Sequence, residues 1–537
     1  CHTTPSCPML SRSNIAPNCM VVTPHHLATQ SAVAILREGG TAIEAMVSAA
    51  ATIAVVYPHM NSIGGDSFWL IVPPSGDPVV IEACGAAGSL ATPEFYEHYH
   101  KIPVKGPKVA NTVAGTVGGW EAALEYVSEC GFERISVNRL LEDAIRYADE
   151  GFPVTKSQHE SLKKLQDAGN IPPEFESVFL PDGEVPKVGT TFCQKQLAET
   201  LTSLAENGLN SFYDGDVANL IAEDMASLGM PITKSDLANY APIRKEPLRL
   251  LHSHGELFNV PPPTQGLVSL ALLGILDKLG IDGQDEAQFI HTAVEATKEV
   301  FKMRDQYITD PAFMKIEPQS LLTGPNLFKM ARGIDFEQAS TVDVTKGPGD
   351  TIWMGAMDSK GFSVSFIQSI YHQFGSNVVL PQTGILWHNR GVTFTLSRDH
   401  ILCIKPGKKP YHTLNPAAAR LHDGRVLVYG TRGGDGQPQT QAAIFHRYAV
   451  QGKDLQQTVS EPRWLYGRIA GNPDTTLKLE GRFSEEIVET LKELGHEVVM
   501  LPDYSEDVGQ AGILVRHPDG NMEGAFDLRS NGSAAGF

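Results

Sequence analysis

Blocks of helical periodicity alternate with blocks of strand periodicity along almost the whole chain, and this alternation limits the fold more than any other feature of the sequence. Residues 24–57 read as two helices separated by Gly39 and Gly40, and the second is so rich in alanine that we expect it to be buried on nearly every side. Residues 61–85 then give two strands joined by a Pro-Pro-Ser-Gly-Asp turn. Such a mixture predicts a layered α/β fold in which helices cover sheets.

The predicted secondary structure changes at residue 351, from helical and weakly patterned segments to strands. Residues 286–309 have a strong amphipathic helix pattern, whereas residues 311–350 are weakly patterned and contain the breakers GPN, GID and GPGD. From Thr351 the chain reads TIWMGAMD, a Ser-Lys-Gly turn and FSVSFIQSI, which is a hairpin signature. Further strands are predicted at RVLVYG and VVMLP, around a helix at SEEIVETLKELG.

Composition excludes several classes of protein. The chain has 537 residues, of which 42% are hydrophobic, so it can bury a large core. No apolar run reaches the roughly 18 to 20 residues that a membrane helix needs. The opening residues contain neither a basic nor an apolar signal region, and we therefore expect a cytoplasmic protein. A net charge of -19 disfavours binding to nucleic acid or to anionic membranes.

Neither a metal nor a cofactor is expected. The seven cysteines show no CxxC spacing and no Cys/His ligand spacing, which argues against a zinc site and against a disulfide framework. No GxGxxG or GK[ST] pattern indicates a nucleotide.

Thr351 could act as a nucleophile only if a base assisted its hydroxyl. A cut before Thr351 would create such a base, because a free α-amino group has a pKa of about 7.7 to 8.0. The same hydroxyl could begin that cut by attacking the carbonyl of Asp350, if the backbone were held under strain. Gly347, Pro348 and Gly349 permit unusual backbone geometry. Spacing alone favours a simpler alternative, in which GPGD is a turn that enters a strand.

The chain resembles the γ-glutamyltranspeptidase family of N-terminal-nucleophile hydrolases, from the helix pair at 24–57 to the final DLRSNGSAAGF. In that family the segment TxxxSVVDxDGxAVSxTxTxNxxFG opens with the nucleophilic threonine. TIWMGAMDSKGFSVSFIQSIYHQFG fits this segment, with Asp358 and Gly361 in register. The resemblance implies self-cleavage between Asp350 and Thr351, with Thr351 as the catalytic residue.

The resemblance also implies a fold and a subunit arrangement. The family fold is a four-layer αββα sandwich, so we expect residues 1–350 and 351–537 to be the larger and smaller cleavage products of one αββα domain. The two products would stay together as a heterodimer, and the stretch before Asp350 would move away after the cut.

Further site residues follow from matching motifs. Ser369 falls where the family has a second hydroxyl near the nucleophile. YGTRGGDGQPQT places Gly433 and Gly434 at the oxyanion hole, whose backbone N–H groups stabilise the negative charge that develops on the attacked carbonyl oxygen. PGKKPYHTLNP resembles PGKRPxSSMxP and places His412 and Thr413 at the family's serine pair.

Departures from the family pattern argue against a γ-glutamyl substrate. Cys84, in EACGAAGSLA, stands where the family has the arginine that binds the α-carboxylate. Val392 and Thr393, in HNRGVTF, stand where it has the acids that bind the α-ammonium, and Tyr371 replaces an asparagine. A γ-glutamyl group would be bound with unpaired charges, at a loss of several kcal/mol.

Basic and aromatic side chains take the place of those groups, which suits a small anionic amide without an ammonium. The substrate-binding candidates are Tyr371, His388, Arg390, His412, Thr413, Arg432 and Cys84. The oxamate amidohydrolase branch of the family, which acts in purine breakdown, is similar to the chain. We therefore expect hydrolysis of oxamate to oxalate and ammonia.

Two alternatives remain open. One is a γ-glutamyl hydrolase, a transpeptidase or an acylase with a rebuilt pocket, and the other is an uncleaved family member with a binding or structural role. Taken singly, a glycine pair is usually a turn, and buried histidines and arginines usually serve packing or structural carboxylates.

Overall fold

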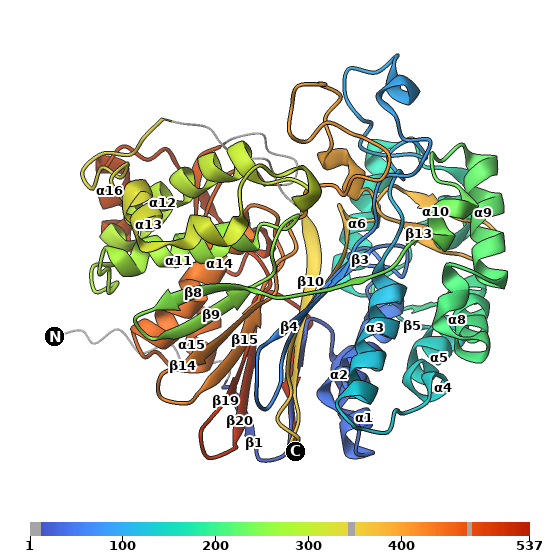
Figure 1. Ribbon diagram of the computed structural model, residues 1–537, viewed down its shortest axis with the longest axis horizontal. Helices are drawn as coiled ribbons and strands as arrows, with labels where there is room; N and C mark the ends of the chain where they lie inside the picture. Colours follow the sequence, from blue (N-terminus) through green and yellow to red (C-terminus); the bar gives the residue numbers. More distant parts are fainter. Residues whose placement is uncertain (1–11, 342–348, 470–474) are drawn as a thin grey trace.

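Two seven-stranded sheets lie face to face between two layers of helices (Figure 1). The structure is a computed structural model that describes residues 12–341, 349–469 and 475–537. The strand order is β1-β20-β19-β15-β14-β9-β8 in the first sheet and β21-β2-β10-β11-β3-β4-β7 in the second. Neighbouring strands within both sheets are antiparallel. The four-layer αββα sandwich expected from the family resemblance is confirmed.

Both sheets combine strands from the two sides of Asp350. The strands of the first sheet are β1 (Asn14–Ala16), β8 (Leu248–His252), β9 (Gly255–Asn259), β14 (Ala417–Leu421), β15 (Val426–Gly430), β19 (Gly512–Arg516) and β20 (Met522–Phe526). Those of the second are β2 (Met20–Thr23), β3 (Asp66–Val72), β4 (Val79–Ala83), β7 (Ile243–Lys245), β10 (Asp350–Met357), β11 (Ser363–Tyr371) and β21 (Ser533–Ala535). Neither sheet is complete without residues from both parts of the chain.

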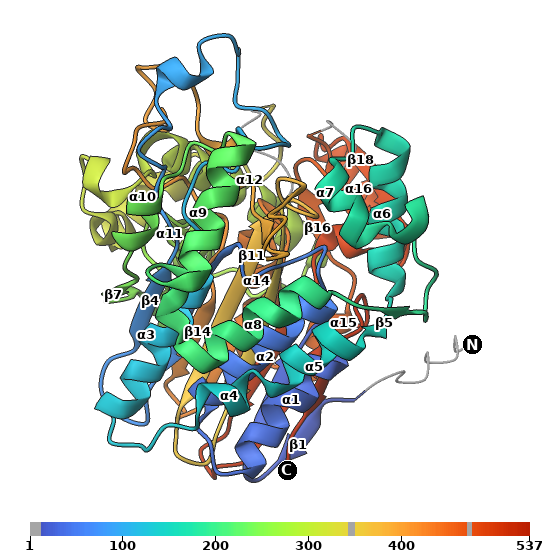
Figure 2. The same ribbon diagram turned by 90° about the vertical axis from the view of Figure 1, so that its right-hand side faces the viewer.

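Each sheet has its own helical cover. Figure 2 shows the cover of the second sheet in front, with α1 (His26–Arg37), α2 (Ala42–Val56), α3 (Thr116–Glu129), α5 (Glu142–Glu150) and α8 (Lys195–Asn207). The first sheet packs against α11 (Gly266–Lys278), α12 (Glu286–Tyr307) and α14 (Gly436–Phe445). A third apolar layer fills the space between the sheets and includes Phe68, Phe258, Trp353 and Leu514.

Smaller elements surround this sandwich. The other α-helices are α4 (Val137–Leu140), α6 (Lys156–Ala168), α7 (Pro173–Phe179), α9 (Asp216–Leu228), α10 (Lys234–Ala238), α13 (Gly324–Ala331), α15 (Leu455–Ser460) and α16 (Glu485–Glu493). Two pairs of short strands form small sheets: β5 (Phe152–Pro153) with β6 (Thr191–Phe192), and β12 (Val378–Val379) with β13 (Leu386–Trp387). A three-stranded sheet consists of β16 (Trp464–Tyr466), β17 (Leu477–Glu480) and β18 (Val498–Leu501). In the described parts of the chain no helix combines the length and the apolar character that crossing a bilayer requires.

Most predicted elements are present. The helices α1 and α2 flank the predicted break, and every residue of α2 is buried as expected. The hairpin β10–β11 is also confirmed. The weakly patterned stretch after residue 311 contains a helix, α13, that was not predicted. Residues 342–348, which include Gly347 and Pro348 of the expected strained segment, lie outside the described residues.

Candidate active site

Thr351 lies where the hairpin departs from regular pairing. Asp350 pairs with Tyr371 and Ile352 pairs with Gln368, so the two residues between Gln368 and Tyr371 lie opposite Thr351 alone. Such a bulge re-aims side chains and is common next to active sites. The Thr351 side chain is buried, and its hydroxyl donates a hydrogen bond of 2.8 Å to the carbonyl oxygen of Gln368. The bond expected to be cut therefore lies at the irregular end of an otherwise regular ladder.

Ser369 contacts the same bond from the neighbouring strand. Its hydroxyl donates a 2.7 Å hydrogen bond to the carbonyl oxygen of Asp350 and accepts one of 2.8 Å from the backbone N–H of Tyr371. A donor on that oxygen stabilises the negative charge that would develop there if the Thr351 hydroxyl attacked the carbonyl carbon. The geometry thus places one hydroxyl beside the scissile bond and another on its carbonyl oxygen.

Gly433 and Gly434 form the loop that leads into α14. Their φ angles of +122° and +51° lie in a region that side chains disfavour. A Cβ atom added to Gly349 would lie 3.5 Å from the Cα of Gly434, so this loop passes beside the cleavage segment. Backbone N–H groups near the start of a helix are suited to bind an oxyanion.

Gln265, which sequence reasoning missed, holds this loop in place. It precedes α11, and its side-chain amide donates to the carbonyl oxygens of Gly434 at 2.7 Å and Thr413 at 3.0 Å. One side chain therefore joins two of the predicted site segments. No local pattern marks Gln265, because both of its partners lie about 150 or more residues along the chain.

Arg390 is a buried cation next to Tyr371. Its guanidinium lies 4.1 Å from the centre of the Tyr371 ring, and Nη1 donates to the Thr413 hydroxyl at 3.0 Å. Among the described residues Nη2 has no hydrogen-bond partner. Burial lowers the pKa of Arg390 to about 10, so it remains charged at neutral pH. A buried guanidinium with a free donor is suited to bind a carboxylate.

His388 and His412 both face the carboxylate of Asp66. One oxygen of Asp66 lies 3.3 Å from Nδ1 of His388 and 3.8 Å from Nε2 of His412. The other accepts hydrogen bonds from the backbone N–H groups of Gly85 and Gly115. Burial raises the pKa of Asp66 and lowers those of both histidines. Sequence reasoning did not identify Asp66 as a site residue. Its position could have indicated one, because Asp66 is a charged residue at the start of an apolar strand, directly after IGG.

Arg432 contacts the residue before the scissile bond. Its Nη1 lies 3.3 Å from Oδ1 of Asp350, and its Nη2 donates to the carbonyl oxygen of Glu506 at 3.1 Å. Burial alone would lower the pKa of Arg432, but the charges of Asp350 and Glu506 raise it.

Cys84 lies directly before Gly85, whose backbone N–H donates to the Asp66 carboxylate. It is fully buried in the apolar layer between the two sheets, directly after β4. Burial raises the pKa of its thiol well above the usual value, which keeps the thiol neutral. Its predicted contact with substrate stays a prediction.

Comparisons with known proteins show the family of the chain. The family model for gamma-glutamyltranspeptidase matches residues 28–537. The chain is 57% identical to the oxamate amidohydrolase proenzyme of Klebsiella pneumoniae over 98% of this chain and 99% of that protein. It is 36% identical to the glutathione hydrolase-like YwrD proenzyme of Bacillus subtilis over 98% of this chain and 100% of that protein.

Among solved structures, a cephalosporin acylase from Bacillus halodurans superposes with a TM-score of 0.89 at 30% identity, covering 100% of this chain and 99% of the acylase. Fold, motif positions and sequence identity lead to the same conclusion: the chain belongs to the γ-glutamyltranspeptidase family of N-terminal-nucleophile hydrolases.

Proposed function

We propose that the chain cuts itself between Asp350 and Thr351 and that Thr351 then hydrolyses a small anionic amide, oxamate in the first place. The observation that carries this proposal is the placement of the Asp350 carbonyl, which is bound by the Ser369 hydroxyl and followed directly by the buried hydroxyl of Thr351. The name of the relative that is 57% identical supports oxamate as the substrate.

Cleavage begins when the Thr351 hydroxyl attacks the carbonyl carbon of Asp350. The Ser369 hydroxyl stabilises the oxyanion, and the C–N bond breaks as the nitrogen of Thr351 takes up a proton. The resulting ester between Asp350 and the threonine oxygen is then hydrolysed by water. The products are a chain end at Asp350 and a free α-amino group on Thr351.

Amide hydrolysis uses the two groups of the new terminal residue. The α-amino group accepts the proton of the Thr351 hydroxyl while that oxygen attacks the substrate carbonyl. The backbone N–H groups of Gly433 and Gly434 stabilise the oxyanion, and the same proton is passed to the departing ammonia. Water then releases the acyl group from the threonine ester.

Arg390 and Thr413 would bind the carboxylate of oxamate. Nη2 of Arg390 has no hydrogen-bond partner in the described residues, and the guanidinium lies against Tyr371, which pairs with Asp350 in the ladder. Val392 and Thr393 offer no anion for the ammonium of a γ-glutamyl group. His388 and His412 support this pocket from the side of Asp66.

The two cleavage products, residues 1–350 and 351–537, would stay together as one domain. Both sheets take strands from each product, so separation would break backbone pairing in both sheets. The cytoplasmic location expected from the sequence remains part of the proposal. Five free cysteines among the described residues suit a reducing compartment.

The test combines a denaturing gel, amino-terminal sequencing and an ammonia-release assay on oxamate. We expect two bands, a new terminus at Thr351 and ammonia release, all of which Thr351→Ala abolishes. Thr351→Ser, which keeps a hydroxyl, should retain slow cleavage and some activity. A single intact band that persists in the wild type would instead support an uncleaved binding protein.

The structural match to a cephalosporin acylase favours an acylase as a second candidate. This candidate would use the same nucleophile on a larger acyl group. Product analysis with oxamate, glutathione and a glutaryl amide distinguishes the two, because an oxamate-type site should release ammonia from the first far faster than amine from the others.

A further inference from the structure

Arg432 is a buried cation whose carboxylate partner belongs to the cleavage residue itself. The Arg432 side chain is 7% exposed and that of Asp350 is 18% exposed. Arg432 also donates to the carbonyl oxygen of Glu506 and to the sulfur of Met60. Nε of Arg432 has no hydrogen-bond partner within the part of the chain that the structure describes. Asp350 therefore supplies the nearest anionic partner of this guanidinium.

Cleavage would remove that partner from its fixed position. Once the bond after Asp350 is cut and its ester is hydrolysed, Asp350 becomes the end of the larger product and no longer has to stay beside Thr351. The charge of Glu506 would still act on Arg432, but among the described residues only Asp350 lies at ion-pair distance from its guanidinium. Loss of that contact in a buried site is costly, so the site would favour the binding of another carboxylate.

The acyl group of Asp350 also indicates how far that carboxylate should lie from the carbonyl carbon that Thr351 attacks. The Thr351 hydroxyl attacks the carbonyl carbon of Asp350 during cleavage and the carbonyl carbon of the substrate during catalysis, so the two carbons must occupy the same place. In Asp350 a carboxylate follows the carbonyl carbon after two intervening carbons. An acyl group of four carbons with a carboxylate at its far end reproduces this spacing.

We propose that Arg432 forms an anion subsite, filled by Asp350 before cleavage and used afterwards for the far carboxylate of four-carbon dicarboxylic acid monoamides, of which succinamate is the simplest. This inference rests on the proposed function, because it requires the cut before Thr351. Oxamate is shorter, with its carboxylate directly on the scissile carbonyl, so it relies on Arg390 rather than on Arg432.

The reaction follows the same steps as with oxamate. The Thr351 oxygen forms a bond to the amide carbon of succinamate, the C–N bond breaks, and ammonia leaves with the proton that the α-amino group took from the hydroxyl. One water molecule then hydrolyses the succinyl ester. Succinamate and water thus give succinate and ammonia, without any oxidant or cofactor.

Binding of succinate, measured by titration calorimetry, tests the subsite without requiring turnover. Mature wild-type enzyme should bind succinate, and Arg432→Gln should weaken the binding at least about 30-fold. Arg432→Lys, which keeps the charge, should lose less. The uncut Thr351→Ala variant, in which Asp350 still occupies Arg432, should bind no succinate.

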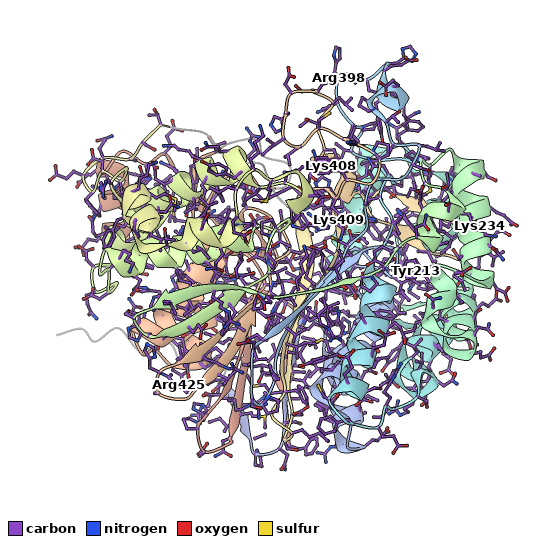
Figure 3. The ribbon with its side chains drawn as sticks, viewed as in Figure 1. Tyr213, Lys234, Arg398, Lys408, Lys409 and Arg425 are labelled. Carbon is purple, nitrogen blue, oxygen red and sulfur yellow. The ribbon has the colours of Figure 1, made fainter. Side chains whose placement is uncertain are left out.

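Arg398→Gln is the matched control. Arg398 is an exposed arginine paired with Glu94, high on a loop that projects from one end of the molecule (Figure 3). Its replacement should leave succinate binding unchanged. Each variant is compared on its cleaved fraction, counted from the new Thr351 terminus.

Turnover gives a second readout. The ratio of kcat/KM for succinamate to that for butanamide, its neutral analogue, should fall at least about 30-fold in Arg432→Gln. The loss on succinamate should exceed the loss on oxamate, whereas Arg390→Gln should show the opposite order.

The outcomes separate the two proposals. A cleaved enzyme that hydrolyses oxamate but neither binds succinate nor hydrolyses succinamate would overturn the subsite and leave the proposed function intact. Equal succinate binding by wild type and Arg432→Gln would do the same. An uncleaved chain, seen as one band on the gel, would contradict the proposed function and the subsite together. If Arg432→Gln is not cleaved, succinate binding by mature wild type and by Thr351→Ala still decides.

Discussion

Removal of the Ser369 hydroxyl should slow cleavage without preventing folding. Ser369→Ala leaves the strand pairing intact but removes the hydrogen bond to the Asp350 carbonyl. Loss of one oxyanion donor typically costs about a hundred-fold to a thousand-fold in rate. We expect cleavage to slow by about a hundred-fold, followed on denaturing gels over time.

Ser369→Thr serves as the control because it keeps a hydroxyl at the same position. Its cleavage should stay within about ten-fold of the wild type, which corresponds to roughly 1.4 kcal/mol. Cleavage of Ser369→Ala at the wild-type rate would show that this hydroxyl does not stabilise the oxyanion.

Arg390 should determine recognition of the substrate carboxylate. Arg390→Gln removes the charge but keeps a donor for the Thr413 hydroxyl. Truncating one partner of a buried charge pair typically costs about 2 to 5 kcal/mol, so kcat/KM for oxamate should fall at least about 30-fold. Hydrolysis of propanamide, which has no carboxylate, should change little. Equal losses on both amides would indicate a structural role for Arg390.

At the scale of elements, the sequence predicted what local pattern determines. The break at Gly39 and Gly40, the buried α2 and the β10–β11 hairpin all follow from periodicity within short windows. The bulge at Thr351 was not predicted from local pattern, because it depends on the register between two strands.

The parts of the site that sequence reasoning missed depend on still longer contacts. Asp66 lies beside His388 and His412, which are more than 300 residues later in the sequence. Gln265 binds Gly434, which is 169 residues later. Motif matching placed the histidines and glycines by resemblance. It could not supply the carboxylate and amide partners that hold them.

Asp358 joins two elements on opposite sides of the cleavage bond. One carboxylate oxygen accepts from the backbone N–H of Ala42, at the start of α2, and the other accepts from Lys360 and Phe362 in the β10–β11 turn. Asp358→Ala would leave these buried donors without their acceptor. We expect the free energy of unfolding, measured by urea denaturation, to fall by about 1 to 3 kcal/mol.

Asp358→Asn is the intermediate case, since it keeps one acceptor oxygen and should lose less than Asp358→Ala. No change in unfolding in either variant would mean that water replaces the carboxylate at all three N–H groups.

At the scale of the molecule, the shared sheets determine whether the two cleavage products stay associated. β10 lies between β2 and β11, and β11 lies between β10 and β3, so backbone pairing crosses the cut on both sides of the hairpin. The two products should therefore elute as one species in gel filtration and separate only in denaturant. Elution as two separate species under native conditions would contradict this arrangement.

Buried histidines should make the whole molecule sensitive to acid. Burial lowers the pKa of His25, His59, His372 and His496 to about 3, and that of His252 and His446 to about 4. In the unfolded chain a histidine titrates near 6.5, so below that pH the unfolded state binds more protons and stability falls. Asp66, Asp358 and Glu506, whose pKa values burial raises, oppose this trend.

Because these histidines outnumber the opposing acids, the melting temperature should fall between pH 6.5 and pH 4.5, with net proton uptake on unfolding. His496 isolates one contribution. Nε2 of His496 lies 2.7 Å from Nδ1 of His291, and burial lowers the pKa of His496 to about 3. His496→Gln should remove about 1 kcal/mol per pH unit from the dependence of unfolding free energy on pH. Calorimetry at pH 4.5, 5.5 and 6.5 measures this slope, and an identical slope in the variant would mean that His496 titrates normally in the folded protein.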